Sequence, residues 1–196
     1  DWSSDVCSSD LETFIHAKKA EAPDAGFEPP LPLSESLFPF QRDIVAWALR
    51  KGRAAIFAAF GLGKTRMQIE LARQVCAHTG GRFLIVAPLG VRGEFIRDGE
   101  AMGVTVRFIR RIEEADETGI YLTNYETVRD GRLDPRHFGG ASLDEAAILA
   151  SMGGTKTFRE FMKLFAGDDR SGVQGVEVKY RYVATATPSP RATSPP

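Results

Sequence analysis

The stretch Gly61-Leu62-Gly63-Lys64-Thr65 combines residue types and a spacing that suit the binding of phosphate. Its glycines let the backbone approach an anion closely, and the N–H groups at the start of a following helix point at that anion. In such a loop Lys64 would reach the β- and γ-phosphates of a nucleotide, and the Thr65 hydroxyl would bind Mg²⁺. The stretch therefore predicts a cofactor-binding loop for a nucleoside triphosphate with Mg²⁺.

The segments on either side of this stretch support the prediction. Residues 54–57 form a short apolar run typical of a buried strand, and apolar residues recur at helical spacing from Met67 until Gly80. One position departs from the general pattern G-x-x-x-x-G-K-[ST], because Ala58 stands in place of the first glycine. A glycine-rich helix start with a surface lysine and no ligand is the alternative, and the order of strand, glycine turn and helix argues against it.

The adjacent carboxylates Asp144 and Glu145 are the second candidate group. A phosphate loop needs a carboxylate for the Mg²⁺ shell, usually at the end of another strand. Asp144 would hold Mg²⁺ through water, and Glu145 would act as the general base on the attacking water. Such pairs are common on surfaces, so the position after a candidate strand carries the prediction. The predicted catalytic residues are Lys64, Asp144 and Glu145, and the predicted metal ligands are Thr65 and Asp144.

A parallel sheet could bring these residues together. The run 83–87 is apolar nearly throughout, as in a strand buried on both faces. We expect strands at 54–57, 83–87, 104–109, 120–123, 139–145 and 180–184. We expect helices at 11–20, before Gly52, after Lys64, at 91–102 and at 158–165. This alternation predicts an α/β fold with a mostly parallel sheet and helices on both faces.

Composition excludes several classes of protein. The 196 residues carry a formal net charge of −1, with 43% hydrophobic and 26% charged residues, which is typical of a soluble globular domain. No apolar run approaches the roughly 18 residues of a membrane helix. Cys7, Cys76 and the three histidines are too scattered for a disulfide framework or a zinc site, so we expect a cytoplasmic protein. The net charge argues against nucleic-acid binding by bulk electrostatics, so such binding would depend on local loops and helix N-termini.

Several motifs in order resemble those of superfamily-2 DEAD/DEAH-box helicase-like ATPases of the phage and Swi/Snf types. The Ala58 form of the phosphate loop is similar to that family's Walker A variant. Gln41 after Phe40 resembles the Q motif, which reads adenine, and 144–147 resembles the DEAD/DEAH box. The resemblance covers residues 37 to 190. It implies a RecA-like P-loop NTPase domain with ATP and Mg²⁺ as cofactors and Gln41 as an ATP-binding residue.

Three further segments resemble motifs of the same family. Pro88 falls in a segment similar to motif Ia, and Thr123 and Asn124 fall in one similar to motif Ib. The resemblance implies that these residues face nucleic acid, although ordinary exits from strands to loops are the alternative. The segment Thr185-Ala186-Thr187 resembles motif III, which couples the nucleotide site to the nucleic-acid side. The resemblance thus implies an ATP-dependent helicase or translocase that acts on DNA or RNA, with DNA favoured as the partner.

Two features depart from the family's pattern. Ala147 stands where many relatives have Asp or His at the fourth position of the box. The motifs of the family's second RecA-like domain, with an arginine finger that contributes about 10³–10⁵ in rate in related phosphoryl transfers, do not follow motif III. We therefore expect that the second domain lies outside this chain, and that the chain alone binds ATP weakly and hydrolyses it very slowly.

The expected organisation is one domain with two short flanks. The ATP-binding domain spans 34–190, after a disordered or extended leader at 1–33 and before a disordered tail at 191–196. Residues 1–11 resemble translated adapter sequence. Two other functions stay open: a nucleotide-binding module that does not hydrolyse ATP, and another P-loop ATPase, such as a motor or a DNA-packaging enzyme, that needs a partner's arginine finger.

Overall fold

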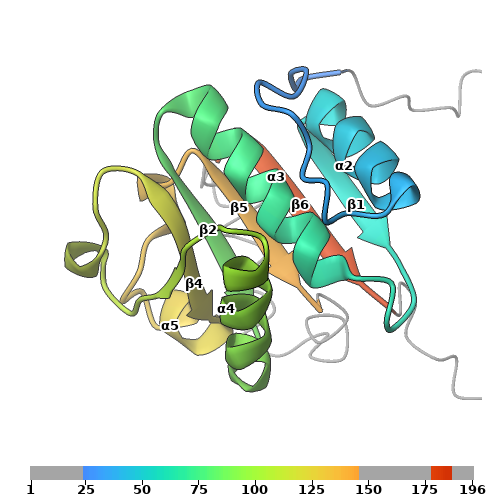
Figure 1. Cartoon of the computed structure of the whole chain (residues 1–196). Helices are drawn as coiled ribbons and strands as arrows, with labels where there is room; N and C mark the ends of the chain where they lie inside the picture. Colours follow the sequence, from blue (N-terminus) through green and yellow to red (C-terminus); the bar gives the residue numbers. More distant parts are fainter. Residues whose placement is uncertain (1–23, 146–177, 187–196) are drawn as a thin grey trace, which may run out of the picture.

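The computed structural model describes residues 24–145 and 178–186, which form one six-stranded sheet (Figure 1). Every neighbouring pair of strands is parallel, and the strand order is β1-β6-β5-β2-β4-β3. The strands are β1 (Arg53–Phe57), β2 (Arg82–Ala87), β3 (Val106–Phe108), β4 (Gly119–Asn124), β5 (Gly140–Asp144) and β6 (Tyr180–Thr185). The predicted α/β fold with a parallel sheet is confirmed.

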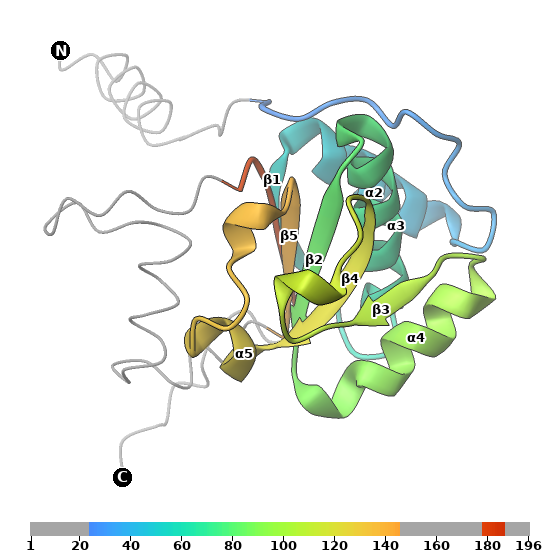
Figure 2. The ribbon, with the colours of Figure 1, turned by 90° about the vertical axis from the view of Figure 1, so that its left-hand side faces the viewer.

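Helices cover both faces of the sheet (Figure 2). The helices α2 (Pro39–Lys51), α3 (Lys64–Thr79) and α4 (Arg92–Ala101) lie on one face, and the short helix α5 (Tyr125–Arg129) lies on the other. Three single-turn 3₁₀ helices complete the described elements: η1 (Leu89–Val91), η2 (Ile112–Glu114) and η3 (Pro135–His137). The helices expected at 11–20 and 158–165 lie outside the described residues.

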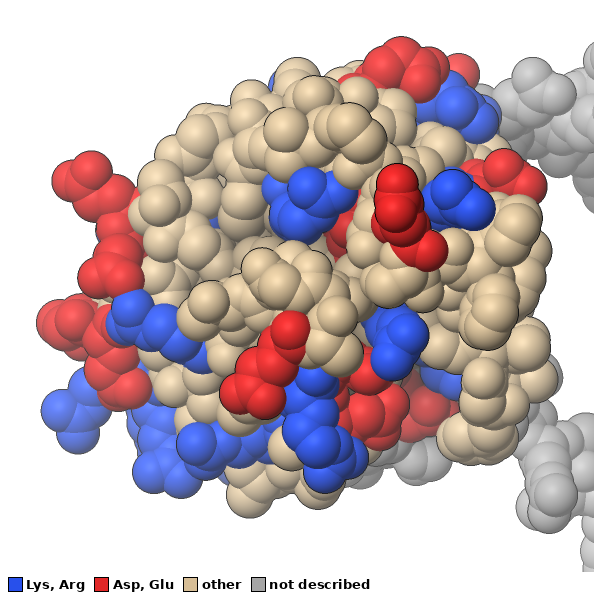
Figure 3. Space-filling model, viewed as in Figure 1, with Lys and Arg blue, Asp and Glu red and all other residues tan. Residues whose placement is uncertain are grey.

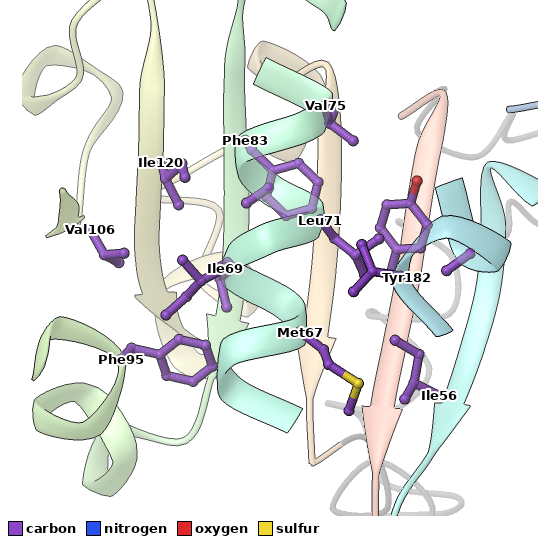
Figure 4. Packing of buried hydrophobic residues seen from close by; sticks show 14 of the residues in the cluster. Ile56, Met67, Ile69, Leu71, Val75, Phe83, Phe95, Val106, Ile120 and Tyr182 are labelled. Atoms are coloured by element: carbon purple, nitrogen blue, oxygen red, sulfur yellow. The ribbon is translucent and has the colours of Figure 1, made fainter. Parts of the chain in front are cut away.

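Helix α3 is at the centre of the larger apolar core (Figure 4). Met67, Ile69 and Leu71 of this helix are fully buried against the sheet. Successive side chains of a strand point to opposite faces. Phe83 of β2 accordingly packs beneath α3, while Leu84 belongs to the core on the opposite face. This two-sided burial explains why residues 83–87 of β2 are all apolar.

Strand β3 and helix α4 are both shorter than the sequence predicts. Strand β3 was expected from residue 104 but begins at Val106. Gly103 adopts a left-handed backbone conformation with a φ of 69°, and the Val104 N–H donates to the Gly99 carbonyl at 2.8 Å. Val104 therefore completes the end of α4 and is not available for the ladder. At its other end, α4 begins at Arg92 because the three preceding residues form η1.

The segment 24–38, here called the strap, runs along the outer side of α2 and α3 and is bonded to α3. The Gln74 side chain accepts from the Leu31 N–H and donates to the Leu31 carbonyl, both at 3.1 Å. The fully buried Glu70 carboxylate accepts from Gln74 and from Arg73, and Arg73 also donates to the Pro32 carbonyl at 2.6 Å. In the ranges 24–145 and 178–186, no helix is long and apolar enough to cross a membrane.

Candidate nucleotide-binding site

The segments singled out in the sequence meet at one edge of the sheet, where the carboxyl ends of the strands lie. Phe57 at the end of β1 pairs with Thr185 at the end of β6, and Asp144 of β5 pairs with Ala184. The next pair of strands, β2 and β4, ends at Ala87 and Asn124, which are also paired. Open parallel sheets bind their ligands at this edge.

The predicted phosphate loop, residues 58–63, connects β1 to the first turn of α3, in the order of strand, loop and helix that the sequence predicts. Gly61 and Gly63 have φ values of 83° and 72°, which residues with a Cβ rarely adopt. Gly63 is constrained further, because a Cβ at this position would lie 2.4 Å from the Gln41 Nε2 atom. The two glycines are therefore needed for the shape of the loop as well as for access to its backbone.

Lys64 lies folded over the loop that it follows. Its Nζ donates to the carbonyl of Ala58 at 3.0 Å and to that of Ala59 at 3.3 Å, and it lies 5.0 Å from the centre of the Phe60 ring. The two carbonyls are neutral acceptors, whereas an ammonium group forms stronger hydrogen bonds with negatively charged acceptors. Phosphate oxygens entering the loop would replace the carbonyls as the partners of Lys64.

The Thr65 hydroxyl bonds to a carboxylate that was not predicted from the sequence. Thr65 is 7% exposed, and its Oγ1 donates to Glu94 Oε1 of α4 at 2.6 Å. A hydroxyl has one proton and two lone pairs. With the proton directed at Glu94, the lone pairs of Thr65 remain available to a cation.

Asp144 is nearly buried and is held by a side-chain amide. Its Oδ1 accepts from Gln68 Nε2 at 2.7 Å. Burial raises the pKa of the Asp144 carboxyl above its ordinary value, Glu145 and Glu94 act in the same direction, and the bond from Gln68 and the charge of Lys64 oppose the rise. Asp144 is thus an acid whose negative charge is incompletely offset by the protein.

Glu145 and Tyr125 fix the backbone around Asp144. Glu145 has a φ of 50°, the one non-glycine residue with positive φ among the described residues, and such backbone strain is concentrated at functional sites. The Tyr125 hydroxyl of α5 donates to the Asp144 carbonyl at 2.6 Å. Burial, followed by the charges of Asp144 and Glu145, raises the pKa of Tyr125, so this hydroxyl remains a donor.

A cavity of about 320 Å³ brings together six of the eight residues predicted to bind nucleotide and metal or to act in catalysis. This volume is at the lower end for ligand sites. The cavity is lined by Phe60, Gly61, Gly63, Lys64, Thr65, Val91, Glu94, Asp144 and Glu145. Leu62 is outside this lining, although its carbonyl takes part in the loop by accepting from Gln41. The sequence thus predicted a set of residues that the fold does gather around one cavity.

The residues around the cavity fit a Mg²⁺ ion. Three carboxylates and the Thr65 hydroxyl face one lysine, so the site presents oxygen ligands and an excess of negative charge, which a hard divalent cation prefers. No cluster of three or more Asp, Glu, His or Cys side chains in the described part of the chain could hold a metal ion without other ligands. Thr65 and Asp144 would therefore share the ion with phosphate oxygens and water, as is usual for Mg²⁺.

Gln41 lies next to the loop, and its amide is already bonded to the protein. It is 3% exposed; its Nε2 donates to the Leu62 carbonyl at 2.9 Å, and its Oε1 accepts from the Phe38 N–H at 2.9 Å. Gln41 therefore joins the start of α2 to the phosphate loop. Its role in reading adenine stays a prediction, because these bonds would have to be exchanged or shared when a base binds.

The residues predicted to face nucleic acid differ in their access to the surface. Pro88 is partly buried at the start of η1. Thr123 is 1% exposed and its hydroxyl donates to the Ile109 carbonyl at 2.9 Å, so its side chain does not reach the surface. The partly buried Asn124 side chain donates to Glu126 at 2.7 Å. Of the motif Ib pair, only Asn124 has a side chain near solvent.

The segment predicted to couple the two sides lies against the phosphate loop. The Ala58 N–H, at the start of the loop, donates to the Thr185 carbonyl at 3.2 Å. Ala186 follows as a partly buried residue, and Thr187 lies outside the described residues. The end of β6 is therefore placed where a change in the loop would reach it directly.

Sequence reasoning missed three polar residues of the site: Gln68, Glu94 and Ser142. Gln68 lies four residues after Lys64, a spacing that places both on the same side of a helix and could have identified it. Ser142 lies two residues before Asp144 on a buried strand, so the two share a face. Glu94 gives no comparable signal, because only the packing of α4 against α3 brings it to Thr65.

Comparison with known proteins shows the fold. No protein-family model and no curated protein matches the sequence. Among solved structures, the Sulfolobus solfataricus SWI2/SNF2 ATPase core in complex with dsDNA has a TM-score of 0.59 and 19% identity, covering 83% of this chain and 34% of that one. The UvsW helicase from bacteriophage T4 has a TM-score of 0.56 and 16% identity, covering 90% of this chain and 60% of that one.

At these identities the likeness concerns the fold alone, and it confirms the predicted RecA-like α/β architecture. A second structure of T4 UvsW gives a TM-score of 0.55 at 15% identity and covers 92% of this chain. The chain spans from about a third to 60% of the length of these matched chains.

Proposed function

We propose that this chain is the ATP-binding domain of a nucleic-acid-dependent ATPase, a helicase or translocase that couples ATP hydrolysis to movement on DNA or RNA. One observation carries the proposal: the phosphate loop and the pair Asp144-Glu145, far apart in the sequence, line the same cavity at the carboxyl edge of a parallel sheet. The fold shared with the SWI2/SNF2 core and UvsW supports the nucleic-acid-dependent part.

Each residue has a role that follows from its placement. The loop N–H groups and Lys64 would bind the β- and γ-phosphates, and Thr65 with Asp144 would hold Mg²⁺. When bound, Mg²⁺ neutralises charge on the phosphate oxygens. The Glu145 carboxylate, partly buried at the cavity wall, would accept a proton from the attacking water. Gln41 would read adenine, exchanging its bond to Leu62 or Phe38 for the base.

The partner surface would lie beside this edge of the sheet. Asn124 ends β4 and Pro88 follows β2, and both would face the nucleic-acid backbone. The segment Thr185 to Thr187 would couple this surface to the nucleotide. The structurally similar SWI2/SNF2 core was solved in complex with dsDNA, which favours DNA over RNA as the partner. Acidic and basic side chains are interspersed over much of the face in Figure 3, which favours local contacts over bulk charge. A second RecA-like domain would supply the arginine finger.

The decisive experiment compares nucleotide binding by Lys64→Ala with that by Lys51→Ala. Lys51 is at the opposite edge of the sheet, where it pairs with Asp24. Loss of a charged hydrogen bond of about 1.5–3 kcal/mol should weaken Mg²⁺·ATP binding by about 10- to 100-fold in Lys64→Ala alone. Calorimetric titration measures both affinities, and circular dichroism checks the fold. Equal affinities in the two variants would refute the phosphate loop.

A hydrolysis assay distinguishes the proposed ATPase from a module that only binds nucleotide. The Glu145→Gln variant should bind Mg²⁺·ATP as the parent does and lower the single-turnover rate of hydrolysis by about 10²-fold or more, because the general base is lost. The rate is measured with single-stranded and duplex DNA present. If the parent and Glu145→Gln hydrolysed ATP equally slowly, the chain would be a module that does not use Glu145.

A further inference from the structure

We propose that Gln68 is a positioning residue of the nucleotide site: its buried amide, oriented by Ser142, holds the Asp144 carboxylate in the place from which it binds Mg²⁺. The inference rests on the proposed nucleotide-binding function and extends it to two residues that no motif contains.

Two hydrogen bonds fix the Gln68 side chain. Its Nε2 donates to Asp144 Oδ1 at 2.7 Å, and its Oε1 accepts from the Ser142 hydroxyl at 2.6 Å. A carboxylate only accepts, whereas a hydroxyl can donate. The Asp144 carboxylate therefore requires the NH₂ group of Gln68, and the Ser142 hydroxyl, by donating to the amide oxygen, holds the side chain in that orientation.

The local structure explains how these three side chains meet. Ser142 and Asp144 are two residues apart on β5, so both point at α3. Gln68 lies one helical turn after Lys64 and therefore points to the same side of α3 as the lysine. One helix thus presents Lys64, Thr65 and Gln68 in succession to the predicted positions of the phosphates, the cation and the carboxylate.

The complete burial of the Gln68 amide indicates that it has a specific role. Gln68 and Ser142 are both 0% exposed, and the neighbours Met67 and Leu71 on α3 are fully buried apolar residues. A polar group in such surroundings is costly unless every donor and acceptor has a partner. Leucine would fill a similar volume without this requirement. What glutamine provides in addition is a donor aimed at Asp144.

A carboxylate with one oxygen held in this way has a restricted rotamer. Asp144 Oδ1 is occupied by Gln68, which leaves Oδ2 and the second lone pair of Oδ1 for other partners. Metal ligands in proteins are commonly oriented by such outer hydrogen bonds, and loss of the outer partner weakens metal binding by about 10- to 100-fold. The same consequence should apply to Gln68.

The experiment measures ADP binding to the 196-residue chain by calorimetry, with Mg²⁺ and with EDTA. Gln68→Leu should bind ADP in EDTA as the parent does, within about twofold, while the gain in affinity on adding Mg²⁺ should fall by about tenfold. Ser142→Ala should lower this gain less, because Gln68 keeps its bond to Asp144 and loses only the hydroxyl that bonds to its amide oxygen. A purely structural role would affect both conditions equally.

Gln74→Leu is the matched control. Gln74 is a second glutamine of α3 with 0% exposure, and its amide bonds to Leu31 and Glu70 at a distance from the cavity. Gln74→Leu should leave the gain on adding Mg²⁺ unchanged. The electron paramagnetic resonance spectrum of Mn²⁺ with ADP gives an independent readout, and it should change in Gln68→Leu and not in Gln74→Leu.

The outcomes separate the inference from the function on which it rests. If the parent loses ADP affinity on Lys64→Ala while folded Gln68→Leu keeps the full gain on adding Mg²⁺, Gln68 has no positioning role and the inference fails. If Gln68→Leu does not fold, Ser142→Ala decides in the same way. If Lys64→Ala binds ADP as the parent does, the proposed nucleotide site itself is wrong.

Discussion

Helix α3 contains two fully buried glutamines whose partners differ in kind. Near its start, Gln68 bonds to the side chains of Asp144 and Ser142, at the edge of the cavity. Further along, Gln74 bonds to the backbone of Leu31 in the strap and to Glu70. The first network ends on Asp144, whose negative charge the protein offsets incompletely. In the second network the polar groups are satisfied by partners within the protein.

The difference shows that equal burial does not imply an equal role. The strap end of α3 satisfies its charges within the protein, because Arg73 pairs with Glu70. The cavity end places Glu94, Asp144 and Glu145 near one lysine. Substitutions at the strap end should therefore lower stability and leave nucleotide binding unchanged, whereas substitutions at the cavity end should change binding and can raise stability.

The largest effect on stability is expected for Arg73→Ala. This change leaves the Glu70 carboxylate, which is 0% exposed, without its cation, and removal of one partner of a buried pair costs roughly 3 kcal/mol. Urea unfolding should show the loss, with Mg²⁺·ADP affinity unchanged in the folded protein. A matched control is Arg129→Ala, whose pair with Asp130 is on the other face of the sheet. A loss of ADP affinity in Arg73→Ala would mean that the two ends of α3 are coupled.

A smaller loss is expected for Gln74→Leu. The Leu31 N–H and carbonyl lose their side-chain partners, and each is near enough to the surface to recover part of the loss by binding water. We expect a decrease of about 1–2 kcal/mol in the free energy of unfolding. Limited proteolysis should cleave the strap faster than in the parent. An unchanged cleavage rate would show that Gln74 does not hold the strap.

The smallest effect, of opposite sign, is expected for Asp144→Asn. Burial raises the pKa of Asp144 in the folded protein above 3.8, so the ionised carboxylate destabilises the fold at neutral pH. This destabilisation is absent below pH 3.8, develops as the pH rises from 3.8 to the raised pKa, and is complete above it. Asp144→Asn should therefore raise the urea midpoint at about pH 7, lose this advantage towards about pH 4, and weaken Mg²⁺-dependent ADP binding. Equal urea midpoints of the parent and Asp144→Asn at neutral pH would contradict the expected difference between the two ends of α3.

The sequence predicted the parts of the site that are encoded locally. The phosphate loop depends on glycine conformations and on the first turn of one helix, and both can be read from consecutive residues. Asp144 and Glu145 could be placed because their strand follows others in a regular alternation. Strand β5 itself looked weak, since Leu143 is its one large apolar residue, yet it is central in the sheet. Pairing with β2 on one side and β6 on the other determines the central position of β5. An argument from the β-propensity of single residues does not include such pairing.

The sequence did not predict the contacts between distant segments. Gln68 is 76 residues from Asp144, and Thr65 is 29 residues from Glu94. Such pairs depend on the strand order and on the depth at which α3 and α4 pack. For Thr123, the place at a strand exit favoured a side chain at the surface, and the fold instead brings the carbonyl of Ile109 within reach of its hydroxyl.

The strand order also determines when the site can form. Strand β1 pairs only with β6 within the described sheet, and the Ala58 N–H bonds to Thr185. The phosphate loop is therefore anchored on a strand that the ribosome makes more than a hundred residues later, on the order of ten seconds at usual rates of synthesis. Until then both edges of β1 are unpaired, and one of them stays unpaired in the described sheet. The candidate nucleotide site would therefore form only after β6 has been made, and until then it would depend on protection of the edges of β1.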